Sequence, residues 1–462
     1  MRKHVCLALF LFWASSSFAV LRLPAVIGSN MVLQQQSSVK LWGWCDPQEK
    51  IFITTSWNNR LDSAKGTRDG KWELRVPTIA AGGPYTILVK GNTETIRLDN
   101  VLLGEVWICS GQSNMEMCES WGLPDVRAEL PTCATNNIHF FNIPRTTAAW
   151  PQEDCQTKWT AVDSNSLKHF SAVGYFFARR LQASLNVPVG IIEAAWGGTP
   201  AEVWVPTDTI HSDPMLQQSA EKLEAFDGWP YHSGYCYNGM IAPVVPYTIA
   251  GALWYQGEAN QSIPETYSWL MTTLIRCWRE AWNKELPFYY VQIAPFVYGG
   301  TSSERLREQQ AKLMEVPGTG MVVISDLVND TTNIHPKDKH DVGARLAGWA
   351  LAETYHKTGL FYKSPSFGSM EVKGAKVLLT MRDAPEGLVI RGDRVRECFV
   401  AGEDKVFYPA EVKVEGERLQ VSSPKVKIPV AVRYQFSAAG IGNIFSREGL
   451  PLAPFRTDNW EE

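Results

Sequence analysis

The middle of this 462-residue chain alternates short apolar runs with amphipathic segments, and this alternation limits its fold more than any other feature. Apolar runs at residues 249–255, 288–293 and 321–326 are separated by segments at 265–282 and 304–316, where apolar residues recur with helical spacing. Strands connected through helices pair in parallel, and the helices then cover both faces of the sheet. The pattern predicts an α/β domain with a parallel sheet over residues 100–358.

The same alternation extends towards the N-terminus. An apolar run at residues 101–108 ends near Gly111, so it predicts a strand followed by a turn. A helix is predicted over residues 168–186, where apolar residues recur every four positions on one face, and a buried strand follows at 187–192.

Both flanking regions have β character. Residues 20–99 and 359–462 consist of short alternating runs separated by Gly, Pro, Asn and Asp, which is typical of small β-sandwiches. Examples are residues 39–44, 50–55, 387–390 and 410–414. The pattern is compatible with two separate β regions and with two that pack together.

The first 19 residues have the three parts of a secretory signal peptide. Arg2 and Lys3 precede an apolar run at residues 5–13, and small residues lead to a predicted cleavage site after Ala19. The apolar run is too short to span a membrane. We therefore expect an exported protein, periplasmic or extracellular, with no membrane span.

Export would leave eight cysteines in an oxidising compartment, where disulfides can form. Cys133 and Cys155 flank a loop-like stretch and are the pair we predict. Cys277 lies within a helical pattern, so we expect a buried free thiol there.

The charge excludes one class of partner. Acidic residues number 48 and basic residues 44, and no basic stretch is long enough to follow a phosphate backbone, so nucleic acid is not an expected partner. The 18 tryptophans are compatible with carbohydrate contact, although tryptophan side chains also fill large cores.

Ser113 is the candidate nucleophile. It follows the predicted strand at 101–108 and a glycine turn, which would place its hydroxyl above the sheet edge. A serine in such a turn is more commonly a helix cap, so partners must support the assignment. Met115 stands where the nucleophile elbow of α/β-hydrolases has glycine, which disfavours that family.

His335 is the candidate base. It follows the strand predicted at residues 321–326 and precedes Pro336, which is expected to open a helix, so it would reach the same sheet edge as Ser113. His340 is near, but neither a standard ligand spacing nor a His-Glu-x-x-His motif is present, so we predict no metal.

Two segments could supply the oxyanion hole. Residues 195–199 follow a strand and include Gly198, whose backbone amide is unobstructed by a side chain. Gln256 ends another predicted strand, and its side-chain amide could point across the site. Glu258 is a candidate for orienting that amide.

Four motifs together resemble the sialate O-acetylesterase family over nearly the whole chain after residue 19. They are Gly-Gln-Ser-Asn-Met-Glu at 111–116, Trp-Gly-Gly-Thr-Pro-Ala-Glu at 196–202, Tyr-Gln-Gly-Glu at 255–258, and Ile-His-Pro at 334–336 followed by Val-Gly-x-Arg-Leu-Ala at 342–347. The resemblance implies an SGNH-hydrolase fold with β-rich accessory regions and no cofactor. It implies Ser113 as nucleophile, His335 as base, and Ser113, Gly198 and Gln256 as the oxyanion hole.

One position departs from the SGNH pattern. These enzymes generally have an Asp three residues before the histidine, and here that residue is Thr332. Asp330 and Asn333 are the nearby candidates for orienting His335. We favour a backbone carbonyl instead, because Asp330 would need a sharp loop to reach the ring.

The leading hypothesis is a secreted serine esterase that removes O-acetyl groups from carbohydrates, with O-acetylated sialic acid as the first candidate substrate. Acetylated xylan or another plant glycan is the alternative. A noncatalytic sugar-binding protein and a metal-dependent deacetylase are the competing classes. Trp196, Trp254 and Tyr255 lie beside the oxyanion candidates in the sequence, so we expect a small, acetyl-sized pocket.

Overall fold

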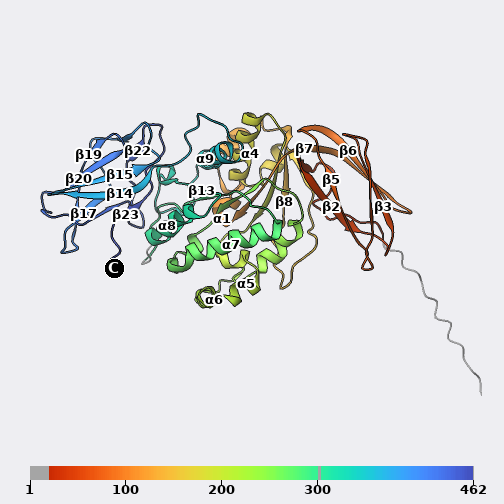
Figure 1. The fold of residues 1–462 in the computed structure, drawn as a ribbon, viewed down its shortest axis with the longest axis horizontal. Helices are drawn as coiled ribbons and strands as arrows, with labels where there is room; N and C mark the ends of the chain where they lie inside the picture. The colour runs from red at the N-terminus through yellow and green to blue at the C-terminus, as the bar shows by residue number, and fades with distance from the viewer. Residues whose placement is uncertain (1–19, 300–302, 461–462) are drawn as a thin grey trace, which may run out of the picture.

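The computed structural model describes residues 20–299 and 303–460, which form three parts in a row (Figure 1). The two β-rich regions lie at opposite ends with the α/β part between them, so they do not pack together. Residues 1–19, where the signal peptide is predicted, lie outside the described residues. None of the described helices is long and apolar enough to cross a membrane.

The central part is built on one mainly parallel sheet. Neighbouring strands pair in parallel, except that the edge strand β9 runs antiparallel to β8. In spatial order the strands are β13 (Thr319–Val322), β12 (Phe288–Val291), β11 (Gly251–Tyr255), β7 (Thr95–Gly111), β10 (Val189–Ala195), β8 (Thr135–Asn142) and β9 (Trp159–Val162). The predicted α/β class, with β-rich regions at both ends, is confirmed.

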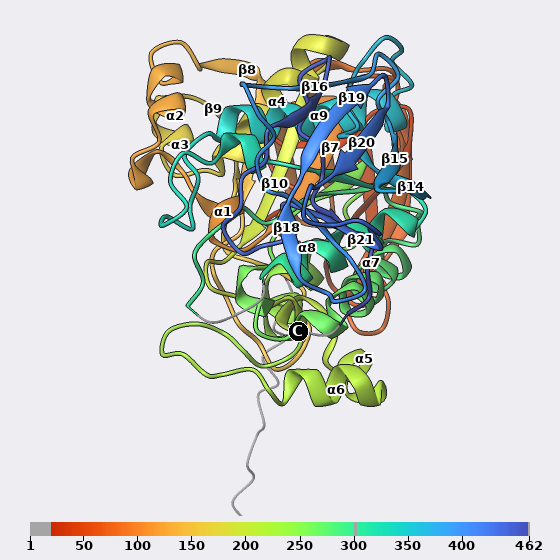
Figure 2. The same cartoon turned by 90° about the vertical axis from the view of Figure 1, so that its left-hand side faces the viewer.

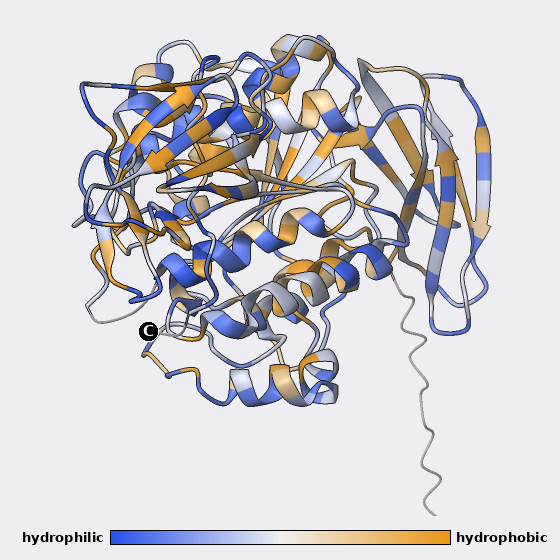
Figure 3. Ribbon diagram, turned by 60° about the vertical axis from the view of Figure 1, so that its left-hand side comes forward, coloured by the Kyte–Doolittle hydropathy of each residue, from blue (hydrophilic) through white to orange (hydrophobic). Residues whose placement is uncertain are grey.

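Helices cover both faces of this sheet, and its strands are apolar on both sides (Figure 3). Along β7, Trp107 and Cys109 pack with α4 and α9, whereas Val106 and Ile108 belong to the cluster that contains residues of α7 and α8. The helices are α1 (Ser113–Glu116), α2 (Pro124–Glu129), α3 (Ser164–Leu167), α4 (Ala172–Leu185), α5 (Thr207–Ser212), α6 (Pro214–Ala220), α7 (Tyr267–Trp282), α8 (Ser303–Lys312) and α9 (Lys339–Trp349).

The N-terminal region shares a strand with the central sheet. The first part of β7 pairs with β6, and its last seven residues pair with β10 on one side, so a single 17-residue strand belongs to both parts. A second sheet of β2 and β5 packs onto this one through a common apolar core. The remaining strands are β1 (Val32–Gln34), β2 (Ser38–Trp44), β3 (Lys50–Thr55), β4 (Leu61–Lys65), β5 (Lys71–Pro77) and β6 (Gly82–Lys90).

The C-terminal region is an antiparallel β domain with its own apolar core, seen in front of the helices in Figure 2. It has two four-stranded sheets and a two-stranded sheet among its described residues. Its strands are β14 (Ser366–Lys373), β15 (Lys376–Arg382), β16 (Leu388–Ile390), β17 (Cys398–Ala401), β18 (Phe407–Pro409), β19 (Glu411–Glu415), β20 (Arg418–Ser422), β21 (Ala431–Tyr434), β22 (Ile444–Ser446) and β23 (Phe455–Arg456).

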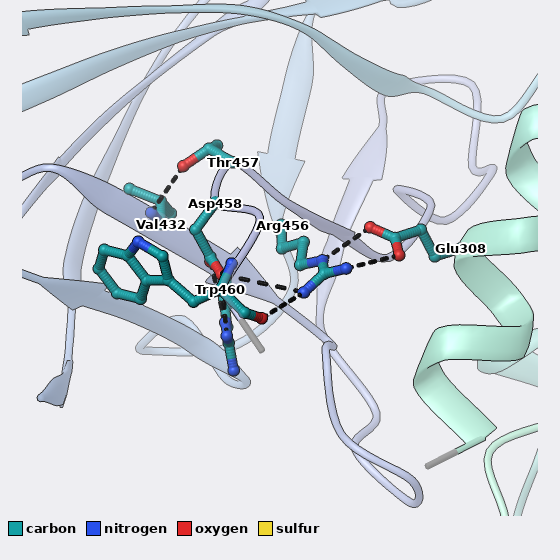
Figure 4. Close-up of polar contacts among 7 residues, drawn as sticks. Glu308, Val432, Arg456, Thr457, Asp458 and Trp460 are labelled. Carbon is teal, nitrogen blue, oxygen red and sulfur yellow. Dashed lines mark hydrogen bonds and ion pairs between the residues drawn. The ribbon is translucent and has the colours of Figure 1, made fainter. Parts of the chain in front are cut away.

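Charged contacts join the C-terminal region to helix α8. Arg456 donates from Nε and Nη2 to the two carboxylate oxygens of Glu308, at 2.8 and 2.9 Å (Figure 4). The buried Arg307, next to Glu308, donates to the carbonyl oxygen of Ala438 at 3.1 Å. Because a bidentate pair fixes both distance and orientation, these contacts hold the domain against the helix that flanks the central sheet.

Several predicted boundaries shift for local reasons. Helix α4 begins at Ala172 rather than 168, because the Ser171 hydroxyl accepts a hydrogen bond from the Gly174 amide and caps the helix. The helix after Pro336 begins only at Lys339, where Asp338 provides the cap. The strand predicted at 321–326 ends at Val322 in β13, and its last residues enter a short 3₁₀ turn.

The predicted disulfide is wrong. All eight cysteines in the described part of the chain are free thiols. Cys133 and Cys155 pack against different hydrophobic clusters, so their sulfur atoms do not meet. Cys277 is a buried free thiol in α7, as predicted.

Candidate active site

Ser113 lies where β7 ends, between the carboxyl ends of β10 and β11. The turn that carries it depends on Gly111, whose φ is +135° and where a Cβ atom would lie 2.2 Å from the carbonyl oxygen of Tyr255. Only glycine fits this close approach without strain. Ser113 then begins the short helix α1 and is 8% exposed, so its hydroxyl stands at the sheet edge as predicted.

His335 reaches the same edge from the opposite loop. Its Nε2 atom is 2.9 Å from Ser113 Oγ, a hydrogen-bond distance, although 222 positions separate the two residues. The pKa of the His335 imidazole is lowered below its ordinary 6.5 by burial and by the nearby positive charge of Lys339. The ring is therefore neutral near pH 7, which a base that must accept the serine proton requires.

Neither candidate for orienting His335 contacts its ring. Asp330 is exposed, and its Oδ1 accepts from the amide and the hydroxyl of Thr332 at 2.8 and 2.6 Å. Asn333 accepts from the His335 backbone amide, at 2.9 Å. Within residues 20–299 and 303–460, Nδ1 of His335 has no hydrogen-bond partner, so the carbonyl that we favoured is not observed either. The edge of the Trp121 ring does contact the imidazole, with ring centroids 5.4 Å apart.

Two backbone amides are free to stabilise an oxyanion. The amide groups of Ser113 and Gly198 have no acceptor among the described residues, while the intervening Gly197 amide donates to Glu116 Oε2 at 2.9 Å. Gly198 has a φ of +75°, a conformation that favours glycine. Both amides belong to segments at the sheet edge, Ser113 after β7 and Gly198 after β10.

The structure places Gln256 differently from our expectation. Its side chain is fully buried, and its Nε2 donates to the Thr199 carbonyl oxygen at 3.2 Å and to Asn260 Oδ1 at 2.7 Å. Asn260 is itself held by Glu202. Since both amide hydrogens have acceptors, Gln256 could donate to an oxyanion only after a rearrangement of this network.

Glu258 also has a different partner from the one expected. It accepts from Asn114 Nδ2 at 2.6 Å rather than orienting Gln256. The same Nδ2 donates to the Ile334 carbonyl oxygen at 3.1 Å, and Asn114 Oδ1 accepts from Lys339 Nζ at 2.7 Å. Asn114, the residue after Ser113, is thus hydrogen-bonded to Ile334, the residue before His335.

This buried network contains a lysine that sequence reasoning missed. Asn114 and Lys339 are fully buried, and burial lowers the pKa of Lys339 to about 7. Burial raises the pKa of the Glu258 carboxyl. The sequence contains one indication that Lys339 would lie near His335: it follows His335 by four residues in a segment predicted to be helical.

The aromatic residues do not form the pocket we expected. Trp254 and Tyr255 are buried in the core, and Trp254 packs edge-on against the rings of Trp204 and Trp278. Of these three, only Trp196 is partly exposed, and its ring lies beside the Arg145 guanidinium. An acetyl-sized pocket made by these three side chains is therefore not what the structure shows.

Metal-binding clusters are not found in the described ranges, where no group of three or more His, Cys, Asp or Glu side chains could hold an ion. His340, the second histidine of this loop, lies against Asp341 at 2.8 Å.

The model of the carbohydrate esterase family described as sialic acid-specific acetylesterase matches residues 103–355, more than half of the chain. The chain belongs to this family. The matched region contains the central sheet from the second half of β7 onwards, with Ser113, Gly198 and His335.

Relatives of known name agree with this membership. A sialate O-acetylesterase from Homo sapiens is 28% identical over 411 residues, which cover 80% of this chain and 78% of the relative. One from Rattus norvegicus is 26% identical over 437 residues, with 80% of each chain covered. The crystal structure of a carbohydrate acetylesterase from Xanthomonas citri is 34% identical, covers 96% of this chain and all of its own, and superimposes with a TM-score of 0.87.

Proposed function

We propose that this carbohydrate esterase removes O-acetyl groups from sugars through an acyl-enzyme formed on Ser113. The observation that carries the proposal is the 2.9 Å contact between Ser113 Oγ and His335 Nε2, beside two backbone amides without acceptors. A serine hydroxyl becomes an effective nucleophile when a neutral imidazole accepts its proton, and this geometry supports that transfer.

The reaction has two steps. Ser113 Oγ attacks the acetyl carbonyl carbon while His335 Nε2 takes the hydroxyl proton, and the amides of Ser113 and Gly198 stabilise the negative oxygen. The tetrahedral intermediate expels the sugar oxygen, which receives the proton from His335. A water molecule then attacks the acetyl-serine, again with His335 as base, and acetate and free Ser113 are released.

O-acetylated sialic acid is the first candidate substrate, because the curated relatives are named sialate O-acetylesterases. Acetylated xylan or another plant glycan is the alternative, since the Xanthomonas citri structure is described only as a carbohydrate acetylesterase. Acetate release should be measured on a panel that contains O-acetylated sialosides, acetylated xylans and p-nitrophenyl acetate. A preference for the xylans would reject the sialic acid assignment and retain the chemistry.

Ser113→Ala tests the chemistry. We expect nearly complete loss of acetate release and no labelling by an organophosphate, with unfolding unchanged. Ser110→Ala is the matched control, because Ser110 is buried three residues away and donates to the Ala194 carbonyl oxygen. An active, folded Ser113→Ala protein would contradict the acyl-enzyme and favour a noncatalytic or metal-dependent alternative, the latter revealed by inhibition with a chelator.

Export is a separate proposal, supported by the charged, apolar and small-residue segments of residues 1–19. Sequencing the N-terminus of the mature protein should give Val20 as the first residue. An intact Met1 in the cellular protein would reject it.

A further inference from the structure

A cavity of about 340 Å³ lies beside the candidate site, at the carboxyl ends of β8 and β10. Its wall includes Glu116, Trp121, Asn142, Arg145, His169 and Glu193. The volume falls in the range of small-ligand pockets, and the wall combines one aromatic ring with several polar groups.

Two walls of this cavity are shared with the catalytic groups. Trp121, on one side, contacts the His335 ring. Glu116, on the other, accepts from the Gly197 amide, and Gly197 is so close to Ser113 that a Cβ added to it would lie 3.3 Å from the serine Cβ. A molecule in the cavity would therefore lie next to an ester bound at Ser113.

The charges in the cavity cancel. Arg145 forms an ion pair with Glu116, so neither side chain offers a free charge. Burial raises the pKa of the Glu193 carboxyl to about 8; the hydrogen bond from Ser171 lowers it by less, and the smaller effects of Glu116 and Arg145 oppose each other. Glu193 is thus mostly protonated at neutral pH and uncharged.

The surroundings of Glu193 leave one of its oxygens available. Oε2 accepts from the Ser171 amide at 2.9 Å, while Oε1 has no hydrogen-bond partner in the described part of the chain. The other ionisable groups near this carboxyl are the thiols of Cys109 and Cys118, whose pKa values are raised by burial, and the His169 side chain on the cavity wall. A protonated carboxyl presents both a donor and an acceptor, which matches a sugar hydroxyl.

We propose that this cavity binds the hydroxylated part of the sugar that carries the acetyl ester, and that Glu193 is the specificity-determining residue that recognises one of its hydroxyl groups. The inference rests on the proposed esterase function. Because the charge of Arg145 is balanced by Glu116 and Glu193 is uncharged, the cavity has no excess positive charge, which favours hydroxyl groups over a carboxylate. If the substrate is a sialic acid, its carboxylate lies outside this cavity.

Two substitutions at Glu193 test the proposal. Glu193→Leu removes the polar group with a similar volume, whereas Glu193→Gln keeps a donor and an acceptor. Kinetics are measured on 9-O-acetylated sialic acid, on acetylated xylo-oligosaccharides and on p-nitrophenyl acetate, which has no sugar. On whichever sugar ester the wild type cleaves better, we expect Glu193→Leu to lower kcat/KM about tenfold, mainly by raising KM. This is the effect of losing one hydrogen bond of about 1.4 kcal/mol. Glu193→Gln should remain within about threefold of the wild type on every ester.

The comparison with p-nitrophenyl acetate separates recognition from a structural role. Equal losses on all esters in Glu193→Leu would show that the carboxyl only supports Ser171 and the start of α4, and would overturn the proposal. Unchanged sugar-ester kinetics in Glu193→Leu, with Ser113-dependent hydrolysis of p-nitrophenyl acetate intact, would overturn the sugar subsite alone. Activity that survives Ser113→Ala would instead overturn the esterase mechanism itself.

Discussion

Replacing Lys339 with methionine should change how the stability of the protein depends on pH. The substitution removes a fully buried ammonium group, 2.7 Å from Asn114 Oδ1, and keeps most of the side-chain volume. Burial lowers the pKa of Lys339 from 10.5 to about 7. Between these two values the unfolded chain binds more protons at this position than the folded protein does, so wild-type stability rises with pH in this window.

The size of the effect follows from this pKa. Each pH unit across the window contributes about 1.4 kcal/mol, and the lysine is half titrated near pH 7. From about pH 7 to about pH 9, Lys339 should therefore add about 2 kcal/mol to the free energy of unfolding. The methionine variant lacks this gain, so the stability difference between the two proteins should change by that amount.

Urea unfolding followed by tryptophan fluorescence at the two pH values measures this difference. Lys168→Met is the matched control, because Lys168 is exposed and should leave the wild-type pH dependence unchanged. Parallel pH dependences for the wild type and Lys339→Met would refute the reasoning, since they would mean that Lys339 titrates alike in the folded and unfolded states.

Three further outcomes are expected. Asp330→Ala should lower kcat less than about tenfold, since the hydrogen bonds of this exposed carboxylate stay within its own loop. His335→Ala should abolish activity. Equal losses of kcat in the two variants would show that Asp330 is the triad acid. Gly198→Ala should lower kcat at least about tenfold, because the backbone has a φ of +75° and the new Cβ would lie 2.4 Å from the ring of Trp229. A variant with the kcat of the wild type would show that the Gly198 amide does not stabilise the oxyanion. Arg456→Ala should increase the rate of proteolysis between the central and C-terminal parts without changing kcat, and Glu308→Ala should have the same effect. If neither variant is cleaved faster than the wild type, this ion pair does not hold the two parts together.

The positions of Ser113 and His335, the candidate nucleophile and base, could be predicted because both depend on strand ends. Ser113 and His335 each follow an apolar strand, and parallel strands bring their carboxyl ends to one edge whatever the loops do. The alternation of strands and helices has the same origin in hydrophobic periodicity, so the fold class could be predicted as well. Boundaries such as the start of α4 depend on one side-chain cap, which periodicity does not report.

Side-chain direction inside the site could not be predicted in the same way. Gln256 follows a strand beside Ser113, but its amide donates to Thr199, which lies on another loop, and to Asn260, four residues further along its own loop. The contacts of Asn114 depend equally on three segments that meet only in the folded protein. Glu193 lies in an apolar strand and belongs to no sequence motif, so it becomes a candidate binding residue only when the cavity beside it is seen.

The strand shared between the N-terminal region and the central sheet has a consequence for folding. Since β7 is hydrogen-bonded to β6 near one end and to β10 and β11 near the other, fraying of the first sheet would loosen the strand that leads to Ser113. A chain shortened to begin at residue 100 would lose the start of β7 and leave Val101 and Leu103, now buried, open to water. Amide hydrogen exchange should accordingly show β6 and the whole of β7 opening together as one cooperative unit. The N-terminal β region therefore belongs to the same cooperative unit as the sheet that carries Ser113, and we expect a shortened enzyme to aggregate rather than merely lose an accessory domain.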